Sequence, residues 1–84
     1  MNWNVVSVKP KPPLALSVRF SDGTEGMVRF ESSHLTGVFE PLRDPKVFVQ
    51  VRVDCGTVSW PGEIDLAPDA MYQEIKRSGE WVLR

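Results

Sequence analysis

The stretch from Thr57 to Tyr72 constrains the fold more than any other part of this chain. Residues 57–60 alternate polar and apolar side chains, which predicts a strand with one solvent-exposed face. Pro61 has no N–H group to extend a sheet, and Gly62 tolerates backbone angles that other residues resist, so the strand should end there in a sharp turn. Pro68 suits a first helical position, where its missing N–H needs no partner. The stretch therefore predicts a strand, a turn and a helix.

The predicted helix covers about residues 68–77 and folds back on the sheet. Asp69 lies in its first turn, where a carboxylate favours the positive end of the helix dipole. Gly79 is expected to end the helix. The next residues, 81–83, are too apolar for a free tail and should dock or pair. An apolar stripe at helical spacing should face the sheet: Met71, Tyr72 and Ile75.

Strict alternation of apolar side chains predicts a hairpin over residues 14–30, with a turn at the S-D-G-T segment. A two-residue turn would leave apolar side chains of the returning strand on the outer face. A loop with an odd number of residues instead pairs Val18 with Val28 and Leu16 with Phe30. Because that register buries both pairs, we expect the odd loop. An N-terminal strand marked by Trp3, Val5 and Val8 should precede the hairpin and end at three prolines: Pro10, Pro12 and Pro13.

Four valines that alternate with other residues predict a further strand: Val47, Val49, Val51 and Val53. A second hairpin should follow, turning at Cys55–Gly56. A two-residue loop there places Val53 opposite Val58 and Val51 opposite Trp60, so the short turn and the burial pattern agree.

Residues 31–45 show no clear period. Ser32 or Ser33 could cap one helical turn, and Gly37 should break it. The Asp44–Pro45 pair resembles a cap followed by a first-turn proline. Three apolar side chains of this segment are expected to fill the core: Val38, Phe39 and Leu42.

Together these elements predict an α+β fold in a small single domain that covers residues 1–84. Two antiparallel β-hairpins plus an N-terminal strand should form a sheet, with one C-terminal helix packed on it. A chain of 84 residues allows one modest core. Its expected members are Leu16, Val18, Phe20, Val28, Phe30, Val49, Val51, Val53, Trp60, Leu66 and Met71.

Composition excludes several classes of protein. The net charge is −1 and no basic stripe is present, so direct binding to nucleic acid is not expected. The single cysteine excludes an intrachain disulfide and fits a reducing cytoplasm. The first residues, M-N-W-N-V-V, are not expected to form a signal peptide. No apolar stretch approaches the roughly twenty residues that span a bilayer. We therefore expect a soluble cytoplasmic protein that does not contact a membrane.

No catalytic or metal site stands out. His34 and Cys55 could form a base and a nucleophile, but nothing in the sequence brings them together. The acids Glu63, Asp65 and Asp69 raise the question of a divalent cation. Their spacing is not that of a known calcium loop, and turn, strand and helix-start roles explain all three. We predict no catalytic residues, no metal and no cofactor.

The order of these features resembles a small bacterial family known as domain of unknown function 2442. The similarity lies in V-x-F-S-D-G over residues 18–23, G-V-F-E-P-L-R-D over residues 37–44, and V-D-C-G-T-V-S-W-P-G-E-I-D-L-A-P-D-A-M-Y over residues 53–72. The resemblance implies a compact α+β domain. Some relatives look fused to a helix-turn-helix domain and others lie beside toxin-like proteins, which suggests regulation or partner binding by analogy. This chain ends at Arg84, so no such fused domain is expected, and the family supplies no catalytic residues.

The leading hypothesis is a non-enzymatic regulatory or protein-binding module, of an antitoxin-like kind, that acts on a protein partner or as a homodimer. The alternative is a small-molecule-binding protein or an enzyme of unknown type. Because the strand stops at Pro61, the corner there should lie at a sheet edge, where proteins recruit other chains. The predicted partner-binding residues are Trp60, Pro61, Gly62, Glu63 and Tyr72. The competing interpretation is that this motif only folds the turn and seats the helix.

Overall fold

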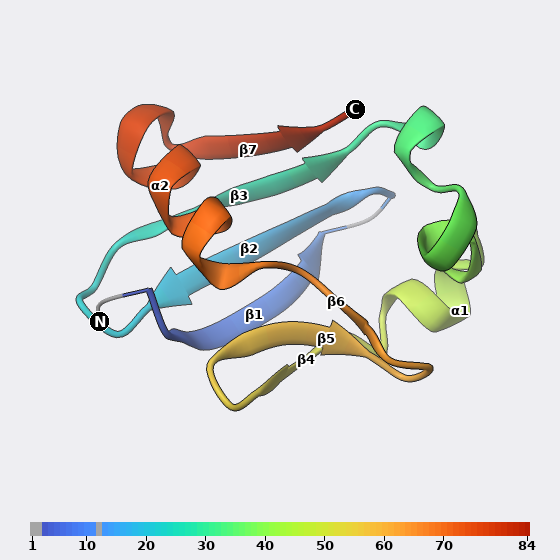
Figure 1. The fold of residues 1–84 in the computed structure, drawn as a ribbon, viewed down its shortest axis with the longest axis horizontal. Helices are drawn as coiled ribbons and strands as arrows, with labels where there is room; N and C mark the ends of the chain where they lie inside the picture. Colours follow the sequence, from blue (N-terminus) through green and yellow to red (C-terminus); the bar gives the residue numbers. More distant parts are fainter. Residues whose placement is uncertain (1–2, 12) are drawn as a thin grey trace.

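The computed structural model describes residues 3–11 and 13–84. Over these residues the chain forms two sheets (Figure 1). The large sheet contains, in spatial order, β1 (Val5–Lys11), β2 (Ala15–Phe20), β3 (Glu25–Phe30) and β7 (Glu80–Leu83). The small sheet contains β4 (Arg52–Asp54), β5 (Thr57–Trp60) and β6 (Ile64–Asp65). The helical segments are η1 (Ser32–His34), η2 (Gly37–Arg43), α1 (Pro45–Phe48) and α2 (Pro68–Ser78).

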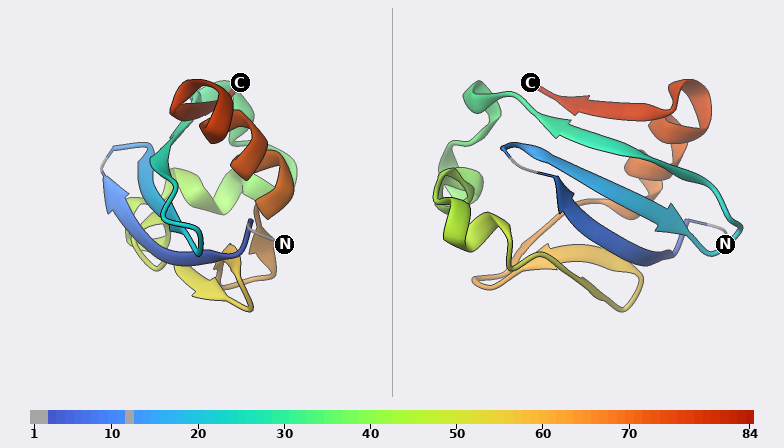
Figure 2. Two further views of the ribbon diagram at one scale, coloured as in Figure 1. Left: turned by 90° about the vertical axis from the view of Figure 1, so that its left-hand side faces the viewer. Right: turned by 180° about the vertical axis from the view of Figure 1, so that it is seen from behind.

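The α+β class is confirmed, but the strands divide between two sheets. β1, β2 and β3 run antiparallel, and β7 joins β3 in parallel after α2 has carried the chain back. In Figure 1, α2 lies in front of β2 and β3, and the small sheet lies beyond β1. Figure 2 shows that the large sheet is curved, that α2 lies on its inner side and that the small sheet lies next to β1. The core fills the space between these parts.

In the first hairpin the odd loop is confirmed, but the predicted register is wrong by two residues. The loop is Ser21–Gly23, closed by a hydrogen bond from the Phe20 N–H to the Thr24 carbonyl at 2.8 Å. Leu16 therefore lies opposite Val28, and Val18 lies opposite Gly26. The reason is tertiary. A side chain at Gly26 would collide with Ile75 of α2, so the smallest residue of β3 occupies the place where the helix crosses.

The first strand continues further than its prolines suggested. Pro10 does not end β1 but lies within it, opposite Leu16. β1 is an outer strand of the large sheet, so a residue without an N–H can point its nitrogen away from β2. The register shifts between Val5 and Ser7, which explains the imperfect alternation of this segment. The predicted role of Pro12 lies outside the described residues.

The valine strand predicted over residues 47–53 is wrong in its first half. Asp44 accepts a hydrogen bond from the Lys46 N–H at 2.9 Å, and Pro45 occupies the first helical position. This cap starts a helical turn, so side chains follow the helical period rather than alternation. Phe48 is consequently buried, whereas 49% of Val49 is exposed.

The second hairpin forms as predicted at its turn, where Val53 pairs with Val58. Cys55 and Gly56 both have positive φ, as a two-residue turn of type I′ requires. The predicted register is confirmed, but β4 begins at Arg52, so the paired residues stop one short of Val51 and Trp60.

Residues 31–43 form short 3-10 segments. Glu31, not Ser32 or Ser33, occupies the cap position of η1, and its side chain makes no capping hydrogen bond. Leu42 is buried as expected and Phe39 packs partly against the core. Val38 is 72% exposed, so its predicted place in the core is wrong.

The C-terminal part agrees with its prediction. α2 ends one residue later than expected, and Gly79 caps it in the left-handed conformation. Residues 81–83 pair with β3 in β7. Val51 and Val53 are only partly buried, and Val49 is outside the core. The list of expected core residues omitted several buried ones: Val5, Leu35, Phe48, Val58 and Ile64.

Candidate partner-binding surface

The corner after β5 is a tight connection between two strands of the small sheet. Trp60 pairs with Ile64, so Pro61, Gly62 and Glu63 form the turn. Gly62 and Glu63 have φ values of 91° and 63°. Glycine adopts such angles freely, but a residue with a Cβ does so at a cost of about 1–2 kcal/mol. Glu63 is therefore an exposed residue in a strained backbone conformation at the rim of the sheet.

Trp60 belongs to the core rather than to this surface. It is fully buried, and its Nε1 donates a hydrogen bond to the Phe48 carbonyl at 2.9 Å. Its ring packs against Phe30 and Phe48 at centroid distances of 6.1 and 6.0 Å. A partner could reach the corner only through Pro61, Gly62 and Glu63, which are all exposed.

The opposite face of the small sheet carries polar side chains. Arg52 of β4, Ser59 of β5 and Asp65 of β6 lie directly across from one another in one row. They belong to a shallow hollow of about 490 Å³ next to the corner. We call it the corner hollow, and its lining residues are Arg52, Asp54, Ser59, Trp60, Gly62, Glu63, Ile64 and Asp65.

Ser59 is the unusual member of the corner hollow. Only 8% of the residue is exposed, and its Oγ is the one buried side-chain oxygen or nitrogen among the described residues without a hydrogen-bond partner. A buried hydroxyl without a partner costs about 1–3 kcal/mol. One residue that lines the corner hollow therefore carries a buried hydroxyl without a hydrogen-bond partner.

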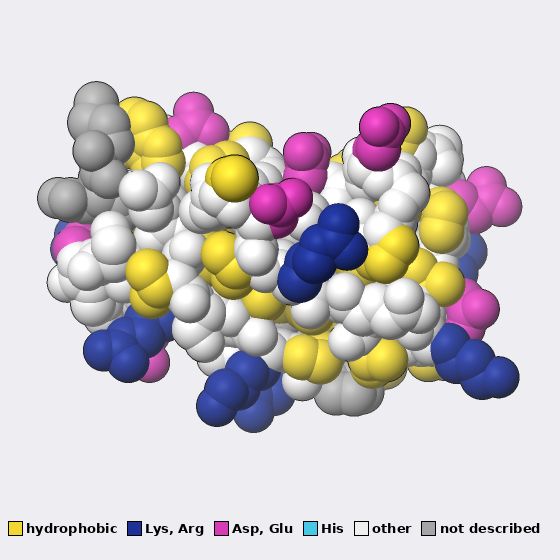
Figure 3. Space-filling view, turned by 90° about the horizontal axis from the view of Figure 1, so that it is seen from below, with side chains coloured by type: hydrophobic (Ala, Val, Ile, Leu, Met, Phe, Trp, Pro, Cys, Tyr) yellow, Lys and Arg dark blue, Asp and Glu magenta, His cyan; other side chains and the backbone are white. Residues whose placement is uncertain are grey.

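The corner hollow is acidic. Asp54, Glu63 and Asp65 supply three exposed carboxylates, against the single guanidinium of Arg52. Figure 3 shows the face on the side of β4 and β5. Acidic side chains gather along its upper margin and most basic side chains along its lower margin. The surface is thus divided by charge although the whole chain is nearly neutral.

Tyr72, the fifth predicted residue, does not line the corner hollow. Its hydroxyl donates a hydrogen bond of 2.5 Å to the carboxylate of Asp22, in the turn between β2 and β3. Its ring meets Phe20 edge-on at 5.1 Å, and the Lys76 ammonium lies 5.9 Å from its centre. The hydrogen bond from Tyr72, followed by those from Thr24, lowers the pKa of Asp22 from 3.8 to about 2. Tyr72 therefore ties α2 to the hairpin.

The other residues with chemical potential are not assembled into a site. Cys55 lies exposed in the β4–β5 turn, at the opposite end of the molecule from η1, which contains His34 (Figure 1). Glu63 and Asp65 share the corner hollow, whereas Asp69 lies in the first turn of α2. Within residues 3–11 and 13–84, no group of three or more His, Cys, Asp or Glu side chains is placed to hold a metal ion.

Three residues that line the corner hollow were not predicted from the sequence: Arg52, Asp54 and Ser59. Alternation along β5 points Ser59 to the outer face of the small sheet and Trp60 to the core. The register of the second hairpin places Arg52 beside Ser59. Both signals were present. The missing hydrogen-bond partner of Ser59 had no sequence signal, because it depends on the conformations of neighbouring side chains.

Comparison with known proteins gives one match. Residues 5–77 match the family model described as protein of unknown function (DUF2442). The comparisons with curated proteins and with solved structures give no significant match. No helix in the described part of the chain is long and apolar enough to cross a membrane. Because the family match covers most of the sequence, the chain belongs to the DUF2442 family of proteins of unknown function.

Proposed function

We propose that residues 1–84 act as one cytoplasmic, non-enzymatic protein-binding module of a regulatory, antitoxin-like kind. Its binding surface is the corner hollow together with the exposed turn Pro61–Glu63. The partner supplies a basic segment, and a lysine or arginine side chain of that segment enters the corner hollow.

The observation that carries this proposal is the unpartnered hydroxyl of Ser59. Ser59 lines the corner hollow, and an N–H group of a partner could donate a hydrogen bond to its buried hydroxyl once the neighbouring side chains move. A group that is costly in the free protein and satisfied in the complex favours binding. Arg52 and Asp65 flank it across the sheet and would need only side-chain rotations to admit a ligand.

Charge complementarity selects the partner. The carboxylates of Asp54, Glu63 and Asp65 surround the hollow and attract a cation, and such complementarity steers encounter as well as register. These carboxylates are exposed, whereas a reaction centre gains from a site that excludes water. The arrangement therefore supports docking better than catalysis.

A titration with defined peptides tests the proposal. ¹⁵N-labelled protein is titrated with the basic peptide acetyl-Gly-Arg-Lys-Arg-Gly-amide and with an acidic peptide in which glutamates replace the three basic residues. We expect saturable amide shifts within residues 52–65 for the basic peptide alone. No saturable shift there, or equal shifts with both peptides, would rule out a cation-selective site.

Two charge reversals locate the site. Glu63→Lys is expected to weaken binding of the basic peptide by about tenfold or more, since it replaces an attraction with a repulsion. Glu40→Lys is the matched control, because Glu40 is an exposed acid of η2 outside the corner hollow. Equal weakening by both variants would indicate a general charge effect and not the corner hollow.

Ser59→Ala separates binding from folding. Removing a buried hydroxyl that has no partner should raise the free energy of unfolding by about 1 kcal/mol or leave it unchanged. The same change should weaken the basic peptide by about fivefold, because one hydrogen bond to a charged donor is lost. Urea melts measure the first effect and the titration the second. A less stable variant that keeps full affinity would assign the hydroxyl to the fold.

A further inference from the structure

β7 is the last strand of the large sheet. It pairs with β3 on one side, and no strand of the described chain lies on its other side. Figures 1 and 2 show this outer side open to solvent, apart from the C-terminal end of α2 near its start. An uncovered outer strand can pair with a strand of another chain.

The backbone of β7 shows which groups are free to pair. Met27 donates to the Gly79 carbonyl at 3.2 Å, and Glu31 donates to the Leu83 carbonyl at 2.8 Å. In a parallel ladder successive residues point their N–H and C=O groups to alternate sides. The N–H and C=O groups of Trp81 and Leu83 therefore face β3, whereas those of Glu80 and Val82 point outward. The Arg84 carbonyl is already engaged, because His34 Nδ1 lies 3.3 Å from it.

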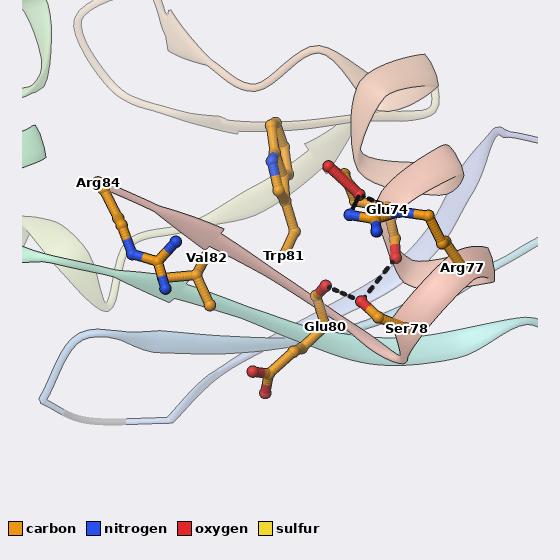
Figure 4. Close-up of a pocket in the computed structure, with 7 residues that line it drawn as sticks. All are labelled: Glu74, Arg77, Ser78, Glu80, Trp81, Val82 and Arg84. Carbon is orange, nitrogen blue, oxygen red and sulfur yellow. Dashed lines mark hydrogen bonds and ion pairs between the residues drawn. The ribbon is translucent and has the colours of Figure 1, made fainter.

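Side chains of α2 and β7 border this edge. A hollow of about 200 Å³ lies beside β7, lined by residues of α2 and β7. Figure 4 shows Trp81 rising on the side of α2 and the Glu80 side chain pointing to the other side. Ser78 Oγ lies 3.0 Å from the Glu80 carbonyl and can donate to it. A carbonyl oxygen has two lone pairs, so this contact still permits a further hydrogen bond.

We propose that β7 is a dimerisation strand that pairs antiparallel with β7 of a second copy of this chain. The pairing is centred on Val82, which lies opposite Val82 of the second copy and exchanges both outward hydrogen bonds with it. The two large sheets then form one continuous sheet across a two-fold axis. This interface does not include the corner hollow and stands independently of the proposed function.

In this register the charged side chains of two copies of β7 are complementary. Centring the pair on Val82 places Glu80 opposite Arg84 of the second copy, and Arg84 opposite Glu80 of the second copy. Glu80 already pairs with Arg29 at 3.0 Å, so its carboxylate would lie between two guanidinium groups. Opposite charges directly across a strand pair favour that register, and like charges disfavour it. On the inner face the same register brings Trp81 opposite Leu83.

Sedimentation equilibrium over a range of protein concentrations tests the dimer. The chain has a mass of 9.5 kDa, and we expect a concentration-dependent rise toward twice that mass. Val82→Pro should abolish the rise, because it removes the central outward N–H while the N–H groups that face β3 remain. A circular dichroism melt confirms that this variant is folded. A chain that stays monomeric up to about 1 mM overturns the proposal.

Charge reversals test the register even if Val82→Pro fails to fold. Arg84→Glu places a glutamate opposite Glu80 at both ends of the strand pair. This like-charge repulsion should weaken the dimer by about tenfold. Exchanging both charges in Glu80→Arg/Arg84→Glu should restore association. Lys11→Glu on the opposite outer strand is the matched control and should have no effect. A dimer that Arg84→Glu leaves unchanged would place the interface elsewhere and overturn the proposal.

Discussion

The two outer strands of the large sheet are protected in different ways. β1 contains Pro10, shifts register between Val5 and Ser7, and carries exposed lysines. Its first residues also meet the small sheet, since the Val5 N–H donates to the Gly56 carbonyl at 2.9 Å. Proline, bulges, lysine and a covering segment are the devices that natural proteins use against unwanted strand pairing. β7 has no proline, bulge or lysine along residues 80–83, and only the C-terminal end of α2 lies near its start (Figure 1).

This difference shows how protection is acquired. Residues of β1 itself provide most of its protection against strand pairing, so this protection acts as soon as the strand forms. β7 becomes an outer strand only after α2 has turned the chain back and laid it against β3. An unprotected outer strand with self-matching charges is what a strand-mediated dimer requires, whereas β1 is closed to such pairing.

The largest expected loss of stability concerns Phe48, which packs behind the small sheet, the part of the molecule that meets β1. Phe48 packs against Trp60 and Phe30 and is fully enclosed. Phe48→Ala should lower the free energy of unfolding by about 3–5 kcal/mol, because it removes burial and leaves a cavity behind the small sheet. Urea melts measure this. Val49→Ala is the matched control and should cost less than about 0.5 kcal/mol, since Val49 is half exposed. A reversed order would restore the alternating-strand interpretation of residues 47–53.

A smaller loss should mark the β7 side at Gly26. A Cβ there would lie 2.5 Å from Ile75 Cγ2 and 2.7 Å from the Gly79 carbonyl oxygen. Gly26→Ala should therefore lower the free energy of unfolding by about 1–3 kcal/mol, because it pushes α2 and the start of β7 away from β3. In the Gly26→Ala variant, the backbone amides of β7 should exchange their hydrogens faster than those of β1. Adding Ile75→Ala should cost less in the Gly26→Ala chain than in the wild type. Equal protection of both outer strands would contradict this coupling.

The smallest expected effect concerns the tie between α2 and the β2–β3 turn. Hydrogen bonds, first that from Tyr72, hold the pKa of Asp22 at about 2, below its usual 3.8. A lowered pKa contributes stability that is complete above about pH 4 and is lost as the pH falls toward about 2. Tyr72→Phe should therefore reduce the fall in melting temperature between about pH 4 and about pH 2. Asp22→Asn, which does not titrate, serves as the control. An unchanged acid profile in Tyr72→Phe would show that this hydrogen bond does not matter in solution.

Local signals explain which parts of the fold the sequence predicted well. Pro68 and Gly79 mark the two ends of α2. A first-turn proline and a left-handed cap affect only the few residues around them, so both ends could be predicted from the sequence. The Cys55–Gly56 turn agreed with the burial pattern on both sides, and the hairpin formed there. The alternating valines from Val47 wrongly predicted a strand, because the cap at Asp44 starts a helical turn there.

The candidate site was predicted only in part. Three of the predicted residues line the corner hollow, namely Trp60, Gly62 and Glu63, but the tryptophan contributes no exposed surface. Tyr72 lies elsewhere because the direction of α2 takes its ring to Asp22. Ser59 gained its importance from neighbours on two other strands.

The sequence by itself determined the α+β class, the limits of α2, the second turn and the corner after Trp60, since each depends on residues within one turn of one another. Tertiary structure alone decided the first hairpin's register, the division into two sheets and the isolation of the Ser59 hydroxyl. It also decided that β7 is an outer strand. The physical reason is that register and exposure depend on which distant surfaces meet. Gly26 lies where α2 crosses, and no local pattern specifies that crossing.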